Sequence, residues 1–377
     1  MWSSDPTALS AAKETFSRRL TRWFPMPGLL MPRAAGVDIS DSSIKWLTLT
    51  PAENGLRVQT YGDIPLRSGI VMNGVIHDVS ALADVLKGVR KELKGIYCAH
   101  AALPEEAAYV FSMQVPSGTP RAQILGMIEF EFEGRVPIPP SAAVYDYNTI
   151  SRDESGSEEI SVVVFPKDVA QAYVDSFSSA GISLLSLEVE ARSIARAVSS
   201  SEEDEPITLL VDFGRARTGF AVVKRGVPIF TSTVEVGGDL IDRMLVGKLS
   251  MSHEDAERFK NDEGLLAPRK GTKSPELDAV SGAAAALADE VARHYHYWDT
   301  RRNEKGERMT PVGRVVLVGG NANLRGLSDY ISGRVQAKAL RGNVWRHVTT
   351  FDDYVPPIDK HNSLQFATAI GLALRGL

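Results

Sequence analysis

Two aspartates occur in the same local pattern in the two halves of this chain. Asp38 lies in the apolar run 36–39 before a serine-rich turn, and Asp212 follows the apolar run 209–211 before a short polar turn. Tight turns with small side chains present backbone N–H groups to phosphates, and carboxylate and water oxygens are the ligands that Mg²⁺ prefers. The pattern therefore predicts a polyphosphate site in which two carboxylates face one hydrated cation.

Both aspartates are expected at the end of a strand that returns as a hairpin. Residues 36–39 are predicted to pair with 44–49, and 209–212 with 218–223, which gives an internal duplication. A third strand-and-turn feature is the apolar run 315–318, which is typical of a buried strand and precedes Gly319 and Gly320. Because glycine has no side chain, this turn lets backbone approach a flat ring or a ribose closely.

Alternating and helical spacings place the other elements. Strands are predicted over 97–103, 107–115, 142–150, 160–166, 182–189 and 227–235, and helices over 80–93, 119–134, 167–180, 190–199, 238–249, 252–261 and 276–303. The acidic run 201–206 separates the two halves and predicts a solvated linker.

Composition excludes several classes of protein. The chain has 377 residues, a net charge of -5 and one cysteine, so a non-specific nucleic-acid binder and an internal disulfide are not expected. No apolar run has the roughly 18 residues of a membrane span, and charges interrupt the amino terminus, which favours a soluble cytoplasmic protein. Residues 1–33 form a basic extension, either a loose tail or an amphipathic segment that docks on a partner or an anionic membrane.

The order and spacing of these motifs resemble the actin-like ATPase superfamily, which includes actin, sugar kinases and FtsA. Within it, the chain is similar to the family of type IV pilus assembly PilM proteins. The superfamily motifs are 36–45, 211–218, 252–260 and 317–327, and the PilM-like segments are 128–133, 136–139, 234–240 and 369–376.

This resemblance implies an α/β fold of the actin-like ATPase type, with two lobes, duplicated ribonuclease-H-like cores and an FtsA-type inserted subdomain. The expected parts are the basic N-terminal extension 1–33, subdomain 1A (34–77, 167–203 and 350–377), inserted subdomain 1C (78–166), subdomain 2A (204–240 and 312–349) and subdomain 2B (241–311).

The resemblance also implies ATP with Mg²⁺ in a cleft between the lobes. Asp38 and Asp212 would hold the metal through water, and Lys45 would reach a phosphate as a point charge. The binding residues implied are Asp38, Ser40, Ser42, Ser43, Lys45, Asp212, Gly214, Ala216, Thr218, Gly238, Glu257, Lys260, Gly319, Gly320, Asn321 and Asn323. Glu131 and Glu133 are the candidate acids for positioning an attacking water, although they equally suit the solvated face of helix 119–134.

The first phosphate turn departs from the family pattern. Ser40 stands where the family usually has glycine, and its Cβ narrows the approach of phosphates. Asp41 would repel a phosphate by about 4 kcal/mol at ~4 Å if it pointed inward, and by little if it faced solvent. In the second turn, Arg215 and Arg217 either offset phosphate charge or face water.

The function implied is that of a cytoplasmic, PilM-like, ATP-binding scaffold with slow or absent ATPase activity. It would bind the N-terminal cytoplasmic peptide of a PilN-like inner-membrane protein through residues near 78–166, and so lie peripherally at the inner membrane. Other pilus inner-membrane components and self-association are further expectations. The alternatives are a nucleotide-free scaffold similar to GspL, an FtsA-like cell-division protein and a sugar-kinase-type phosphotransferase.

Overall fold

The computed structural model describes residues 32–152, 156–200, 202, 205–266, 274–302, 306 and 308–377. Most of the predicted extension 1–33 and part of the linker 201–206 therefore lie outside the described residues. The chain divides into two units, one of residues 1–33 with 376–377 and one of residues 34–375, and all contacts given below lie in the second.

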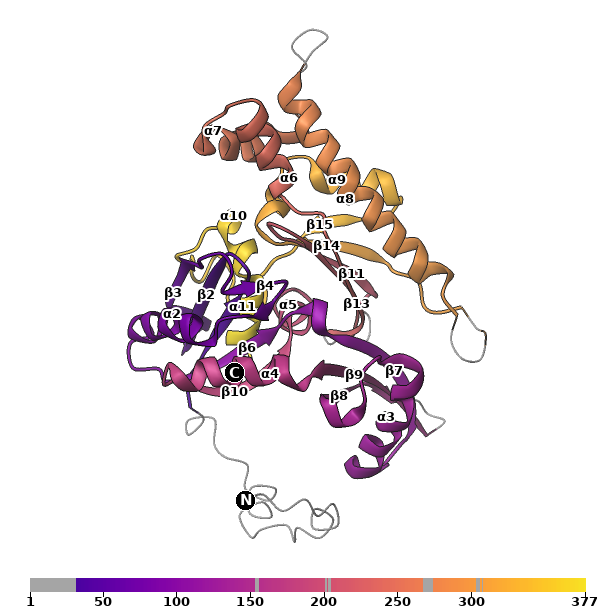
Figure 1. Ribbon diagram of the computed structural model, residues 1–377. Coiled ribbons are helices and arrows are strands. Elements are labelled where there is room, and N and C mark those ends of the chain that lie inside the picture. The colour runs from indigo at the N-terminus through magenta and orange to yellow at the C-terminus, as the bar shows by residue number, and fades with distance from the viewer. Residues whose placement is uncertain are drawn as a thin grey trace. The chain divides into compact units, whose positions relative to one another are not determined.

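A five-stranded sheet forms the first lobe, in the order β10-β6-β1-β2-β3 (Figure 1). Its strands are β1 (Ala34–Ile39), β2 (Ser43–Ala52), β3 (Gly55–Pro65), β6 (Cys98–Leu103) and β10 (Ser183–Val189). β1, β2 and β3 form an antiparallel meander, whereas β1, β6 and β10 are parallel. The helices α2 (Val79–Glu92) and α4 (Lys167–Ser179) contact each other and add Leu86 and Phe177 to the buried core of this lobe.

The second lobe repeats this topology. Its sheet has the order β13-β12-β11-β14-β15, again an antiparallel meander continued by parallel strands. The strands are β11 (Thr208–Phe213), β12 (Thr218–Lys224), β13 (Val227–Val234), β14 (Arg314–Val318) and β15 (Ala339–Arg341). β11 occupies the place of β1, so the predicted duplication of strand, aspartate, turn and strand is confirmed.

A small separate unit is inserted in the first half of the chain. Its three-stranded sheet has the order β7-β9-β8 and is covered by helix α3. The elements are β7 (Tyr109–Pro116), α3 (Arg121–Arg135), β8 (Ala143–Arg152) and β9 (Ser157–Pro166). Ile128 and Phe132 of α3 pack on Ile160 and Val162 of β9 to form its own core.

The limits of this inserted unit differ from the predicted range 78–166. Helix α2 and strand β6 fall inside that range, but β6 is hydrogen-bonded between β1 and β10 and α2 packs in the core of the first lobe. The physical reason is that β6 supplies the parallel neighbour that β1 requires. The separately packed unit therefore begins near Tyr109 and ends at Pro166.

Two helices, α5 (Glu190–Val198) and α11 (Ala367–Ala373), pack closely where the chain passes from the first lobe to the second and returns. A Cβ on Gly371 of α11 would overlap the backbone carbonyl of Ser193 in α5. A Cβ on Gly36 of β1 would likewise overlap the backbone of α11. Glycine at these positions allows α11 to lie against both α5 and the first sheet.

The remaining part of the second lobe is helical. Helix α8 (Pro275–Thr300) packs along α9 (Leu327–Val335), and its His294 ring stacks on Phe220 of β12 at 4.0 Å between centroids. The other elements are β4 (Val71–Met72), β5 (Val75–Ile76), α6 (Asp239–Asp242), α7 (His253–Arg258) and α10 (Lys360–Ser363), with π-helical turns at Arg243–Lys248 and Phe259–Glu263. Among the described residues, no helix is both long enough and apolar enough to cross a membrane.

Candidate functional site

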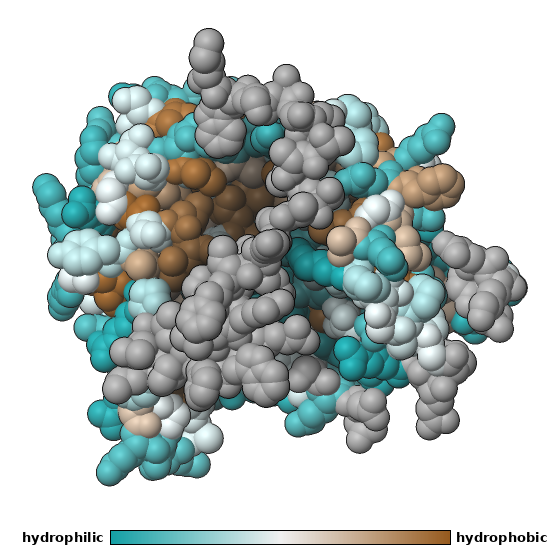
Figure 2. Space-filling view, turned by 90° about the horizontal axis from the view of Figure 1, so that it is seen from below, coloured by the Kyte–Doolittle hydropathy of each residue, from teal (hydrophilic) through white to brown (hydrophobic). Residues whose placement is uncertain are grey.

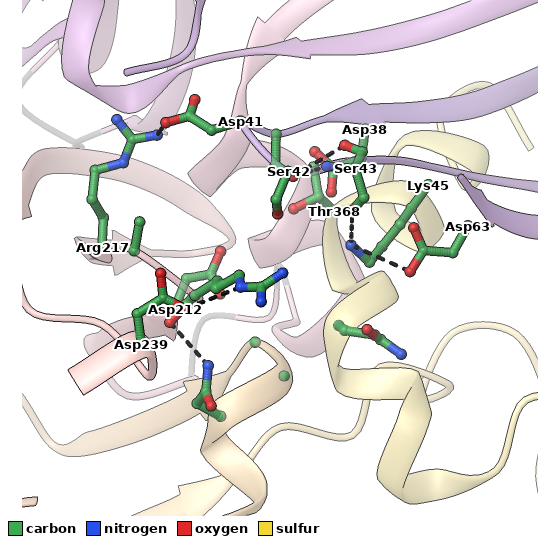
Figure 3. Close-up of a pocket in the computed structure, with 18 of the residues that line it drawn as sticks. Asp38, Asp41, Ser42, Ser43, Lys45, Asp63, Asp212, Arg217, Asp239 and Thr368 are labelled. Atoms are coloured by element: carbon green, nitrogen blue, oxygen red, sulfur yellow. Dashed lines mark hydrogen bonds and ion pairs between the residues drawn. The ribbon is translucent and has the colours of Figure 1, made fainter. Parts of the chain in front are cut away.

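A cavity of about 1150 Å³ lies between the two lobes, at the turns that follow β1 and β11 (Figure 3). All the predicted binding residues line it except Thr218 and Gly238. Those that line it are Asp38, Ser40, Ser42, Ser43, Lys45, Asp212, Gly214, Ala216, Glu257, Lys260, Gly319, Gly320, Asn321 and Asn323. Residues from both halves of the sequence thus meet in one cleft.

Strand register places the two aspartates equivalently. Asp38 lies opposite Lys45 in the β1–β2 pair, and Asp212 lies opposite Gly219 in the β11–β12 pair. Burial raises the pKa of Asp38 to about 6, although the nearby Lys45 opposes the shift. Burial and then the charge of Asp38 raise the pKa of Asp212 to about 7. The charge of Asp38 therefore acts on Asp212, and both residues line the same cleft.

Two glutamates beside these aspartates were missed by the sequence analysis. Glu105 lies in a short turn after β6, and Glu190 begins α5 directly after β10. Burial raises the pKa of both well above the ordinary value, with Asp212 the next cause for Glu105 and Asp38 for Glu190. The sequence alone did not indicate them, because they come to lie beside the aspartates only when β6 and β10 run parallel next to β1, so that the carboxyl ends of these strands meet at one edge of the sheet.

Lys45 is the cationic group next to Asp38. Its Nζ donates to Ser43 Oγ at 2.6 Å and lies 3.8 Å from the carboxylate of Asp63. The Lys45 side chain is 13% exposed, so its charge faces the cleft rather than bulk water. Asp63 on β3 is a further cleft residue that the local sequence pattern did not indicate.

Ser40 closes the first phosphate turn on itself. Its backbone N–H and its hydroxyl both donate to Ser43 O, at 2.9 and 3.0 Å, and its Oγ accepts from the Ser43 backbone N–H at 3.2 Å. The serine side chain therefore rigidifies the turn and occupies one N–H that a glycine at position 40 would leave available to a phosphate.

The Asp41 carboxylate is turned toward the β4–β5 hairpin and Arg217. It accepts hydrogen bonds from the backbone N–H groups of Asn73 and Gly74, at 3.0 and 2.9 Å, and pairs with Arg217 at 2.7 Å. Figure 3 shows Asp41 and Arg217 directed toward each other, apart from Asp38 and Lys45. Because the Arg217 guanidinium offsets the charge of Asp41, we expect this carboxylate to repel a phosphate in the cleft only weakly.

Close backbone approaches explain the glycines on the second-lobe side. A Cβ on Gly319 would overlap the Asp212 carboxylate, and a Cβ on Gly238 would overlap the Asn321 side chain. Asn321 in turn donates from Nδ2 to Gly214 O at 3.0 Å. Thr218 is fully buried and its hydroxyl donates to Val236 O. Gly238 and Thr218 thus do not line the cleft but contact the residues that form its wall.

The helical side of the second lobe contributes a buried lysine. Lys260 is 6% exposed, and its Nζ lies 2.9 Å from Asp242 and 2.6 Å from Glu257. Its pKa is raised despite burial, because it donates to both carboxylates. Asp242 and Glu257 therefore fix the Lys260 ammonium at the cleft wall. The Glu257 side chain is itself 61% exposed.

Glu131 and Glu133, the predicted water-positioning acids, do not line the cleft. Both lie on α3 of the inserted unit, where Glu131 pairs with Arg135 at 2.7 Å and Glu133 is exposed. Their position corresponds to the alternative given above, the solvated face of this helix. Glu105 and Glu190 are among the acids that do line the cleft with Asp38 and Asp212.

The side chains of the cleft suit a polyanion accompanied by a cation. Carboxylates outnumber lysine and arginine among the lining residues, so an anion alone would be repelled. Within the described part of the chain, no group of three or more His, Cys, Asp or Glu side chains is placed to ligate a metal directly. Asp38 and Asp212 would suit a hydrated Mg²⁺, because carboxylate and water oxygens are the ligands that this ion prefers.

The duplicated sheets, the linking helices and the cleft define a two-lobed actin-like fold. Solved structures with this fold include MreB5 of Spiroplasma citri bound to ADP, with a TM-score of 0.51, 14% identity and coverage of 92% of this chain and 95% of that one. Cell division protein FtsA of Streptococcus pneumoniae is 22% identical over 87% of this chain and 81% of its own length.

The sequence profile of the type IV pilus assembly protein PilM family matches residues 36–377, and the chain belongs to that family. Among solved structures, the PilM–PilN type IV pilus biogenesis complex has a TM-score of 0.72 and 20% identity, covering 91% of this chain and 98% of that one.

Proposed function

We propose that this protein binds ATP with Mg²⁺ in the interlobe cleft and acts as a scaffold in type IV pilus assembly. The nucleotide assignment rests on Asp38 and Asp212. Each is the last residue but one of a central strand, and both side chains line the same cleft. Lys45 would approach the phosphates, and Gly319 and Gly320 would leave space for the nucleoside. The cation would neutralise phosphate charge that the acidic cleft alone cannot accept.

Calorimetric titration of ATP–Mg²⁺ tests this assignment. The protein should bind with micromolar affinity, and Asp212→Ala should abolish the heat of binding because one carboxylate that faces the cation is lost. The exposed Asp146→Ala variant, whose side chain is 67% exposed on the inserted unit, is the matched control. Absence of heat from the unmodified protein would contradict nucleotide binding.

We expect ATP turnover to be slow or absent. Phosphoryl transfer to water needs an acid or amide that positions the attacking water, and Glu190 and Glu105 are the acids beside the two aspartates. Burial raises the pKa of both carboxyl groups well above the ordinary value, so each holds its proton more tightly than an exposed glutamate does and is less available as a charged acceptor for water. Nucleotide would then serve chiefly to bias the angle between the lobes and the surface offered to partners.

The partner proposed is the N-terminal cytoplasmic peptide of a PilN-like inner-membrane protein. Family membership supports it, as does the fold shared with a solved PilM–PilN complex. Apolar side chains suited to a peptide are exposed on α4 and on β8, two elements that contact each other, with Val144 38% and Val174 41% exposed. Figure 2 also shows apolar side chains gathered in a hollow on the underside of the molecule. Through this partner the protein would lie in the cytoplasm, peripheral to the inner membrane.

A fluorescence-anisotropy titration with a labelled PilN-like N-terminal peptide tests this surface. Val174→Glu should weaken binding because a charge would replace an apolar contact beside β8. Val355→Glu, at a position that is 71% exposed in the C-terminal part of the chain, is the control and should bind normally. Equal affinity of both variants would place the peptide elsewhere.

A nucleotide-free scaffold is the second candidate, favoured by one specific observation. Ser40 Oγ takes the Ser43 N–H, which removes a phosphate donor from the first turn. The titration described above separates the two candidates, because a nucleotide-free scaffold would bind the PilN-like peptide and give no heat with ATP–Mg²⁺.

A further inference from the structure

The Arg217 side chain joins the two lobes at the phosphate end of the cleft. It projects from the β11–β12 turn of the second lobe, and all three of its acceptors belong to the first half of the chain. Its guanidinium lies 2.7 Å from Asp41 Oδ2, 2.9 Å from Glu106 Oε1 and 3.0 Å from Asn73 Oδ1. Because three separate acceptors use the planar donor fork, the geometry specifies arginine rather than a generic cation.

Two of these acceptors, Asp41 and Asn73, are themselves held in place. Asn73 and Gly74 form the tip of the β4–β5 hairpin with positive φ values of 52° and 70°, as a tight two-residue turn requires. The Asp41 carboxylate accepts both of their backbone N–H groups, and the buried Tyr173 hydroxyl donates to Gly74 O at 2.9 Å. Arg217 therefore meets a preorganised receptor, not a set of mobile surface side chains.

Burial distinguishes this contact from an ordinary surface ion pair. The side chains of Arg217, Asp41 and Glu106 are 17%, 28% and 25% exposed. The neighbouring Arg215 is 65% exposed and pairs with Asp239 of its own lobe. Exposed pairs contribute little to stability, whereas removal of one partner from a shielded pair leaves an uncompensated charge. The same turn thus carries one interlobe arginine and one matched arginine that does not cross the cleft.

We propose that Arg217, with Asp41, Glu106 and Asn73, forms an interlobe latch that keeps the phosphate end of the cleft closed without nucleotide and limits nucleotide exchange. Both phosphate turns carry a latch residue, since Asp41 belongs to the β1–β2 turn and Arg217 to the β11–β12 turn. The lobes cannot separate at this end until the guanidinium leaves its three acceptors. Arg217 is a positioning residue in this role, and the part that concerns exchange rests on the proposed nucleotide binding.

The first test uses the nucleotide-free protein and a distance between the lobes. Spin labels are placed at Asp84→Cys on α2 and Tyr330→Cys on α9 in a Cys98→Ala background, and their distance distribution is measured by pulsed electron paramagnetic resonance. Arg217→Gln should broaden the distribution toward longer distances, and Arg215→Gln should leave it unchanged. Arg217→Lys, which keeps the charge but not the fork, should give an intermediate result.

A double-mutant cycle shows whether the effect passes through the latch. Asp41→Asn should broaden the distribution as Arg217→Gln does, and the double variant should add little to either, because both single changes break one contact. Unchanged distributions in both single variants would overturn the latch.

The second test measures release of a fluorescent ATP analogue by stopped flow. Loss of the latch should speed release roughly tenfold, equivalent to about 1.4 kcal/mol, in Arg217→Gln but not in Arg121→Gln, a change at an exposed arginine of the inserted unit that does not line the cleft. An unchanged release rate would overturn the exchange role. If the unmodified protein binds no nucleotide while the distances change as expected, the proposed ATP binding fails and the latch stands.

Discussion

Asp212→Asn is expected to stabilise the nucleotide-free protein, although it removes a residue of the proposed binding site. The folded state holds the Asp212 carboxyl in a buried place beside Asp38, which raises its pKa to about 7. The folded state therefore binds this proton more tightly than the unfolded chain does, and the free energy of unfolding falls as pH rises from about 4 to about 7. An asparagine keeps the shape of the side chain without the charge.

The magnitude follows from the two pKa values. The difference between about 7 in the fold and the ordinary 3.8 makes ionised Asp212 cost about 4 kcal/mol at pH 8. At pH 5 the folded carboxyl stays protonated, and the cost is about 2 kcal/mol. Because water in the cleft screens the charge, we expect about half of each value, so that the gain from Asp212→Asn rises from about 1 to about 2 kcal/mol.

Thermal unfolding followed by circular dichroism at pH 5 and pH 8 measures this gain. For a chain of this length, about 2 kcal/mol corresponds to roughly 3 °C in melting temperature. Asp146→Asn, whose side chain is 67% exposed, is the control and should change the melting temperature little at either pH. A variant Asp212→Asn that melts below the unmodified protein at pH 8 would refute the account of a strained, buried carboxylate pair.

Three further changes test packing and the walls of the cleft. In a denaturant titration, Gly371→Ala should lower the free energy of unfolding by about 3 kcal/mol, because the added Cβ would overlap the backbone of α5. The control is Gly333→Ala on α9, where an added Cβ meets no atom within 4 Å, and this change should be neutral or stabilising. Phe132→Ala should cost about 3–5 kcal/mol in the inserted unit, seen as early loss of protection from hydrogen exchange over 109–166, and normal protection there would count against a separate core. Tyr173→Phe should cost about 1 kcal/mol and speed amide exchange at Gly74, since a buried hydrogen bond is lost; unchanged exchange would show that the hairpin tip is held without it.

Much of the fold could be predicted because its signals are local. The two hairpins that carry Asp38 and Asp212 alternate in hydrophobicity around short polar turns, and this pattern depends only on neighbouring residues. The long helix 276–303 was likewise indicated by its apolar spacing and is observed as α8 (Pro275–Thr300). From the order of the motifs, residues of both halves were predicted to line one cleft, and most of the predicted binding residues are observed there.

The parts that sequence reasoning did not reach depend on how strands associate. β6 pairs with β1 across more than 60 positions of chain, a contact that no local pattern encodes, so the inserted unit was predicted too large. Glu131 and Glu133 were selected from a matching segment, and tertiary packing places that segment away from the cleft. Glu105 and Glu190 became visible only once β6 and β10 were known to lie parallel beside β1.

Electron paramagnetic resonance of Mn²⁺, used in place of Mg²⁺ and titrated into the protein with ATP, tests the central claim most directly. Free Mn²⁺ gives a strong signal that weakens on binding, and the signal of Mn²⁺ with ATP alone is subtracted, so that the further loss on adding protein gives the fraction bound to the protein. The account predicts one nucleotide-dependent Mn²⁺ that is lost in Asp38→Asn and in Asp212→Asn and kept in Asp146→Asn. Tight nucleotide-dependent Mn²⁺ binding that survives in both cleft variants would contradict the claim that these two carboxylates hold the cation.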